Sequence, residues 1–231
     1  MTLIAPSVSA LVSDLERAAK LRPENTIGGS VIGDFKAGRL PGLKRIGSGL
    51  GRVVYGFSST PAFALKVARH GLGKAQNEVE FRTADPEYTT SVFAHAEDWD
   101  WILVERVQGL KMADFRSFGI AEAADLFWLV LQLGHPGARE KLDRCDGVPP
   151  AIARFVPFMD RWPAIMPDDM GKPTSWGKRD GKPILLDWGF THRMNRARKE
   201  FEAGVGGDPL GSAPGRVGWP ANLSHEHHPS G

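Results

Sequence analysis

The spacing of apolar residues changes along the chain, and each change predicts a different kind of element. Between residues 8 and 20 apolar side chains recur at helical spacing, so we expect an amphipathic helix there. Residues 21–42 are rich in glycine and proline and predict an irregular connector. Residues 1–42 are therefore predicted to be a helix and a linker ahead of the main folded part.

From Leu43 onward the apolar residues fall in short runs bounded by turn residues, a pattern typical of β-strands. Gly71 and Gly73 are predicted to end the first group of strands, and a helix is expected over residues 75–84. Segment 43–107 is thus predicted to be a small sheet with one inserted helix. The predicted strands are LKRI from Leu43, RVVYGF from Arg52, AFALKVA from Ala62, and residues 91–96 and 99–107.

The second half of the chain is predicted to be mainly helical. A helix over residues 152–161 is left open, because Pro157 would interrupt it. Residues 203–231 are dominated by glycine, proline and serine and predict a flexible tail after a unit that covers residues 108–202. The other elements expected are a mostly apolar, buried helix over residues 121–133, a strand over residues 182–188 and a charged helix over residues 192–202.

Composition narrows the class of protein. The hydrophobic share is 42% and the charged share 24%, as in soluble globular proteins. The 29 basic and 27 acidic residues nearly balance, which argues against a nucleic-acid coat protein. No apolar run reaches the roughly 18 residues of a membrane span. The single cysteine, Cys145, cannot form an internal disulfide, so we expect a cytoplasmic protein. From the charge balance and the apolar runs we expect no membrane partner and no specific nucleic-acid partner.

Gly47, Gly49 and Gly51 lie between two strand-like runs. Glycine lets a backbone approach a phosphate closely and direct its amides at it. An ordinary glycine-rich hairpin would have the same composition, and the sequence leaves both interpretations open.

Lys66 lies inside an apolar strand, where its charge is costly without a partner. Alternation places Ala64 on the same face as Lys66. Glu78 and Glu80 in the following helix are the candidate partners, and they are about 200° apart around a helix, so only one can face the sheet. We prefer Glu80, because Val79 then takes part in the packing stripe. An exposed edge-strand lysine remains the alternative.

Two aspartates complete the candidate chemistry. Asp187 ends an apolar strand and is followed by Trp188 and Gly189. A carboxylate at such a position suits Mg²⁺, which prefers oxygen ligands. Asp169 lies in a polar loop upstream, and the residues between the two aspartates leave room for a short hairpin that returns to one site. Ordinary acidic turns are the alternative for both.

The order of these motifs resembles that of the protein-kinase fold family, over roughly residues 43–192. The resemblance implies an α+β, two-lobed fold. The first lobe, residues 43–107, would be a small antiparallel sheet with one helix, and the second, residues 108–202, a reduced and mainly helical lobe.

The resemblance also implies roles for single residues. Gly47, Gly49 and Gly51 would cover the phosphates of ATP. Lys66, in the run Ala64-Leu65-Lys66, would contact those phosphates, and Glu80 would orient it. The residues implied at the remaining positions are Glu105 and Val107 at the adenine, Asp187 and Ser175 at Mg²⁺, and Asp169 and Lys172 in the catalytic loop.

The predicted catalytic loop departs from the family pattern. No His-Arg pair precedes Asp169, and the asparagine expected downstream is replaced by Thr174 or Ser175. Trp176-Gly177 and the run DWGFT from Asp187 resemble small kinase-like proteins of bacteria and bacteriophages. Two hypotheses follow: a minimal ATP- and Mg²⁺-dependent phosphotransferase, Ser/Thr-kinase-like, or a catalytically inactive pseudokinase module.

Either form is expected in the cytoplasm of a bacterium or of a phage-infected cell, or in a virion. The enzyme would act on a protein or a small molecule. The inactive module would serve as a binding or structural part of a bacterial or phage assembly.

Overall fold

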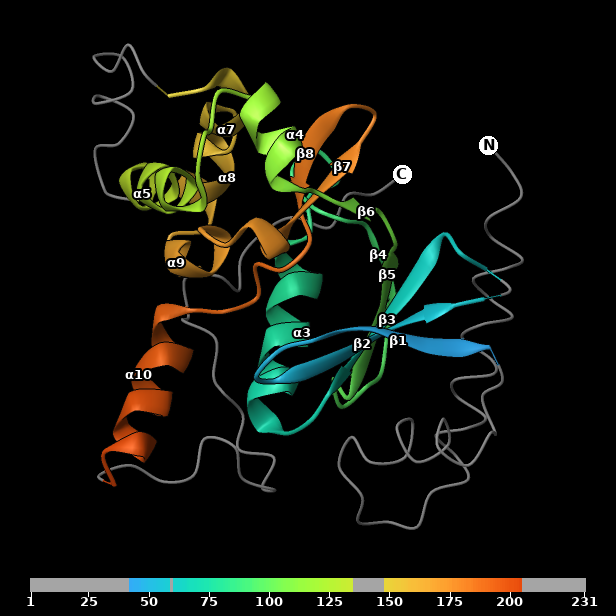
Figure 1. The fold of residues 1–231 in the computed structure, drawn as a ribbon. Helices are drawn as coiled ribbons and strands as arrows, with labels where there is room; N and C mark the ends of the chain where they lie inside the picture. Colours follow the sequence, from blue (N-terminus) through green and yellow to red (C-terminus); the bar gives the residue numbers. More distant parts are fainter. Residues whose placement is uncertain (1–41, 59, 135–147, 205–231) are drawn as a thin grey trace.

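The computed structural model describes residues 42–58, 60–134 and 148–204 (Figure 1). The predicted N-terminal helix, Cys145 and most of the predicted tail lie outside these ranges.

An antiparallel sheet forms the first part of the fold (Figure 1). Its strand order is β1-β2-β3-β5-β4, which places β3 at the centre. Each of these pairings is antiparallel, and the predicted small sheet is confirmed. The strands are β1 (Leu43–Ser48), β2 (Arg52–Phe57), β3 (Phe63–Ala68), β4 (Val92–His95) and β5 (Trp101–Glu105).

The two faces of β3 differ in what they contact. Phe63, Leu65 and Val67 pack into one hydrophobic cluster with residues of β1, β2 and β5. Ala64 packs on the other face with Ile102 and Val104. Lys66 follows Ala64 on that second face, as the alternation predicts.

Helix α3 (Gly71–Thr83) lies along the sheet on the Lys66 face. The prediction that Gly71 and Gly73 precede the helix is wrong, because both lie in its first turn. The cause is a close approach between the helix and the β1–β2 turn: a Cβ on Gly73 would lie 2.1 Å from the backbone oxygen of Gly51. Position 73 thus needs a glycine because a side chain would not fit between α3 and the β1–β2 turn, and not because the chain turns there.

The second part of the fold is mainly helical, with a small antiparallel sheet of order β6-β7-β8. Its buried side chains include Phe115, Leu126, Phe155 and Trp176, and this core continues into α3 through Leu72. The strands are β6 (Gln108–Gly109), β7 (Trp176–Arg179) and β8 (Lys182–Leu185). The helices are α4 (Met112–Ser117), α5 (Ala123–Leu133), α7 (Pro150–Ala153), α8 (Val156–Arg161), α9 (Pro167–Met170), the 3-10 turn η1 (Pro173–Ser175) and α10 (His192–Glu202).

Two helix predictions in this part need correction. The apolar helix α5 is not buried all round, because Trp128 is 61% exposed while Leu126 and Val130 pack into the core. The segment left open because of Pro157 forms two short helices, α7 and α8. Pro157 lies in the first turn of α8, where no backbone N–H is needed for a helical hydrogen bond.

The charged helix predicted from His192 is confirmed as α10, with the same bounds. Within the described ranges, no helix is both long and apolar enough to cross a membrane. This part of the chain is therefore an α+β protein with an antiparallel sheet and several helices.

Candidate functional site

Four charged side chains meet between the sheet, α3 and the segment after β8. Lys66 Nζ lies 2.5 Å from Glu80 Oε2, and Arg52 Nη2 lies 2.7 Å from Glu80 Oε1. The same Arg52 nitrogen lies 2.5 Å from Asp187 Oδ1. Glu80 thus lies between two cations, and Arg52 between two carboxylates. We call Lys66, Glu80, Arg52 and Asp187 the charged cluster.

Strand register places two of these residues on one face of the sheet. Val54 on β2 pairs with Lys66 on β3, so their side chains share a face. Arg52 lies two residues before Val54 and points to the same side. Glu80 reaches this face from α3, and Asp187 from the segment that follows β8.

The cluster is buried on the sheet side and open at Asp187. Glu80 is fully buried, and the side chains of Lys66 and Arg52 are nearly so, while the Asp187 side chain is 45% exposed. A buried charge is tolerated only with a partner of opposite sign, and each oxygen of Glu80 has one. Asp187 is therefore the member that solvent reaches.

Burial and neighbouring charge act in opposite directions on the pKa values of this cluster. Desolvation would raise the pKa of Asp187, but Arg52 and Lys66 outweigh it and hold that pKa below its ordinary value. Desolvation lowers the pKa of Lys66, and Glu80 opposes that shift only in part. Around Arg52, the charges of Glu80 and Asp187 outweigh desolvation and raise its pKa, so the guanidinium stays charged.

The prediction that Lys66 pairs with Glu80 is confirmed. Glu78 faces away from the sheet and forms an i,i+4 pair with Arg82, at 3.0 Å. Helical spacing explains this choice. Ala75 and Val79 pack into the core, and Glu80 lies beside them on the side of α3 that faces inward.

Asp169 and Lys172 form a second ion pair close to the cluster. Burial and the negative charge of Asp187 raise the pKa of Asp169. Ser175 accepts hydrogen bonds at its backbone oxygen from the N–H groups of Leu186, at 2.7 Å, and Asp187. The hairpin β7–β8 thus brings Asp187 back beside the loop of Asp169, and the spacing of the two aspartates had left room for such a hairpin.

The pKa shift of Asp169 predicts a pH effect on stability. A carboxyl whose pKa is higher in the folded state binds its proton more tightly there, so its contribution to stability decreases as pH rises through the shifted value. We expect Asp169→Asn to gain stability relative to the wild type between about pH 4 and about pH 7. Urea denaturation of both proteins at the two pH values measures this difference. A constant difference between them would contradict the prediction.

Close packing explains only some of the predicted glycines. A Cβ on Gly51 would lie 2.4 Å from Gln76 Oε1, and one on Gly189 would lie 2.5 Å from the backbone oxygen of Gln76. Both glycines let their segments approach α3. Gly49 has open space around it and Gly47 only ordinary contacts, so their phosphate role stays a prediction.

The residues predicted at the adenine have structural contacts of their own. Arg179 donates to Glu105 Oε2, at 2.7 Å, and the backbone N–H of Ser91 donates to the same oxygen. Val107 packs so closely on Gly177 that a Cβ there would lie 2.6 Å from its side chain. Contacts with adenine at Glu105 and Val107, and a contact of Ala64 with the cofactor on the Lys66 face, stay predictions.

The residues predicted to bind Mg²⁺ already have partners in this arrangement. Asp187 is bound by Arg52 and Asp169 by Lys172, so both carboxylates already have a cation. The Ser175 hydroxyl donates to the backbone oxygen of Asp169, at 2.7 Å. Within the described ranges, no three His, Cys, Asp or Glu side chains lie close enough to share a metal ion. Mg²⁺ at Asp187 and Ser175 stays a prediction.

Sequence reasoning missed Arg52. The available signal was its spacing from Val54, which opposes Lys66 across the sheet and so assigns Arg52 to the Lys66 face. Trp188, which follows Asp187, also has a clear structural role: its Nε1–H donates to Thr83 Oγ1, at 2.9 Å, and ties this segment to α3.

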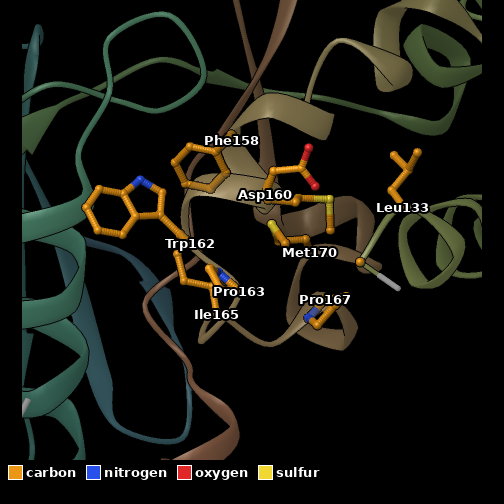
Figure 2. A pocket seen from close by; sticks show the side chains of 10 residues that line it. Leu133, Phe158, Asp160, Trp162, Pro163, Ile165, Pro167 and Met170 are labelled. Atoms are coloured by element: carbon orange, nitrogen blue, oxygen red, sulfur yellow. The ribbon is translucent and has the colours of Figure 1, made fainter. Parts of the chain in front are cut away.

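A separate cavity of about 150 Å³ lies between α5, α8 and α9 (Figure 2). Its lining is mostly apolar, including Leu133, Phe158 and Met170, and Asp160 carries the only charge among the described residues that line it. The residues predicted for ATP or catalysis do not line this cavity.

Comparison with known proteins adds no assignment, since no model of a protein family and no curated protein matches the chain.

Proposed function

We propose that the chain has a two-lobed protein-kinase-like fold, with residues 43–107 and 108–202 as its lobes, and acts as a minimal Ser/Thr-kinase-like ATP phosphotransferase. The observation that carries the proposal is the buried pair of Lys66 and Glu80, with Asp187 and Asp169 next to it. These are the residues to which the resemblance assigns the phosphates and the acceptor.

Lys66 has donor capacity left for a phosphate. Its ammonium group has three N–H donors, of which one goes to Glu80 and one to the backbone oxygen of Leu186, at 2.5 Å. The third would donate to a phosphate oxygen of bound ATP. Val54, directly opposite Lys66 on β2, is half-buried against Ala64 and its neighbours and offers an apolar surface for a base.

Asp169 is the best placed acceptor for the proton that the reaction releases. A substrate hydroxyl attacks the γ-phosphorus of ATP, the bond to the bridging oxygen of ADP breaks, and the hydroxyl proton passes to Asp169. Its raised pKa favours this role, because a base works best when its pKa approaches the working pH. Lys66 would offset the negative charge of the phosphates.

Replacement of Lys66 by methionine tests the proposal. We expect ATP at about 100 times its Kd to stabilise the wild type by about 2.7 kcal/mol in thermal denaturation, and Lys66→Met to lose this effect. Lys44→Met is the matched control, because Lys44 also lies on a strand but is exposed. Transfer from radiolabelled ATP to a protein or small-molecule acceptor should be lost in the same variant. An equal ATP response in all three proteins would reject the proposal.

One observation favours a second candidate, an inactive kinase-fold module of a bacterial or phage assembly, in the cytoplasm or in a virion. Arg52 holds the carboxylate to which the resemblance assigns a metal. Phosphate transfer by the wild type that is lost in Asp169→Asn would reject this candidate. ATP binding without transfer to any acceptor would favour it.

A further inference from the structure

The charged cluster is electrically balanced by its own side chains. Lys66 and Arg52 carry two positive charges, and Glu80 and Asp187 carry two negative charges. The neighbouring pair of Asp169 and Lys172 is balanced as well. No further cation is therefore needed to offset the buried carboxylate of Glu80 or the charge of Asp187.

Arg52 is held in place from three sides. Its Nη2 carries two hydrogens and meets both Glu80 and Asp187, and its Nη1 donates to Asn77 Oδ1, at 3.3 Å. Asn77 is fixed in turn, because its amide donates to the backbone oxygen of Trp99, at 2.8 Å. Arg52 is only 4% exposed, so this is a built position and not a surface contact.

We propose that Arg52 is the resident cation of the charged cluster and takes the place at Asp187 that a divalent ion would need. The site then holds nucleotide phosphates without a divalent metal. This second statement rests on the proposed function, whereas the first concerns the chain's own residues and can be tested with a metal ion alone.

The position of Arg52 in the chain supports the inference. It directly follows Gly51, whose close contact with Gln76 on α3 fixes the end of the glycine turn. The same contact holds the start of β2 near α3 and so brings the guanidinium between Glu80 and Asp187. A divalent ion at Asp187 would lie beside this charge, because a guanidinium is not deprotonated in proteins. An ion at Asp187 would therefore be repelled by a buried and permanent positive charge.

Binding of Mn²⁺ alone to the full chain, followed by electron paramagnetic resonance, tests the inference. We expect no Asp187-dependent binding in the wild type. Arg52→Gln should increase the affinity of Asp187 for Mn²⁺ by about 10-fold or more, because the change removes a positive charge next to the carboxylate. The double variant Arg52→Gln/Asp187→Asn should lose the gain. Arg161→Gln is the matched control, because Arg161 forms an exposed pair with Asp85.

Two results would overturn the inference. One is a folded Arg52→Gln protein that binds Mn²⁺ no more tightly than the wild type. The other is Mn²⁺ binding by the wild type that Asp187→Asn abolishes, and this result needs no variant of Arg52.

ATP binding in EDTA is a separate experiment, which tests the metal-free nucleotide site. Binding there that equals binding with Mg²⁺ supports a metal-free site, and binding only with Mg²⁺ overturns it. Absence of ATP binding in both conditions rejects the proposed function and the metal-free nucleotide site, while the Mn²⁺ result still decides the role of Arg52.

Discussion

Replacing Glu80 by alanine is expected to lower the free energy of unfolding by about 3–5 kcal/mol, the range found when one partner of a buried ion pair is removed. Glu80 is fully buried, and each of its carboxylate oxygens meets a cation, Lys66 or Arg52. The variant would leave both cations buried with less negative charge nearby. Since whole domains are stable by only about 5–15 kcal/mol, this change would remove a large part of the stability of the fold.

Urea denaturation followed by tryptophan fluorescence measures this loss. Glu78→Ala is the matched control, because Glu78 lies on the same helix and its pairing with Arg82 is on the surface. We expect this control to lose less than about 1 kcal/mol. Similar losses of unfolding free energy in Glu80→Ala and Glu78→Ala would contradict the prediction, because burial of the Glu80 ion pairs would then add no stability. Partial recovery in Glu80→Gln would separate the packing of the side chain from its charge.

Gly73→Ala is expected to destabilise the protein by about 1–3 kcal/mol, although alanine is the better helix former. Helix propensity alone predicts a gain of about 0.5–1 kcal/mol, because Gly73 lies within α3. The added methyl group would instead meet backbone: Gly51 O at 2.1 Å and the Cα of Ala68 at 3.0 Å. The sign of the change therefore tells which effect dominates.

Gly49→Ala provides the control for this second prediction. A Cβ at Gly49 meets nothing within 4 Å, so the change in unfolding free energy should be close to zero. Chemical denaturation of the two variants beside the wild type gives both values. A stabilised Gly73→Ala protein would mean that α3 and the β1–β2 turn are farther apart in solution than the structure places them.

Glu80→Ala and Gly73→Ala both change contacts of the same helix, α3. Helix α3 provides Glu80 to the charged cluster and, at its first turn, the glycine on which the β1–β2 turn rests. Arg52 begins β2 directly after that turn. Loss of the close approach at Gly73 is thus expected to move Arg52 as well, which links the packing of α3 to the cation at Asp187.

Local patterns were enough to predict the sheet, α10 and the pairing of Lys66 with Glu80. Strand alternation depends only on the geometry of the backbone, and it placed Lys66 on the face opposite to Leu65. Helical spacing in turn directed Glu80, rather than Glu78, at the sheet. The number of residues between Asp169 and Asp187 left room for the hairpin that the structure contains. In each case the deciding contact lies within an element or between neighbouring elements.

Contacts between distant segments could not be predicted in this way. The start of α3 depends on a backbone contact between Gly73 and Gly51, and a glycine by itself does not tell a turn from a close approach. Likewise, the hydroxyl of Ser175 is directed at the backbone of Asp169 by the path of the loop.

Periodicity and the cost of burying charge act locally, so the sequence was enough to tell which faces are apolar and which charged side chains need a partner. It did not determine which cation meets Asp187. Arg52 and Asp187 are 135 residues apart, and they meet only because β2, α3 and the end of β8 pack together. The choice between an arginine and a metal ion at that carboxylate therefore depends on tertiary packing.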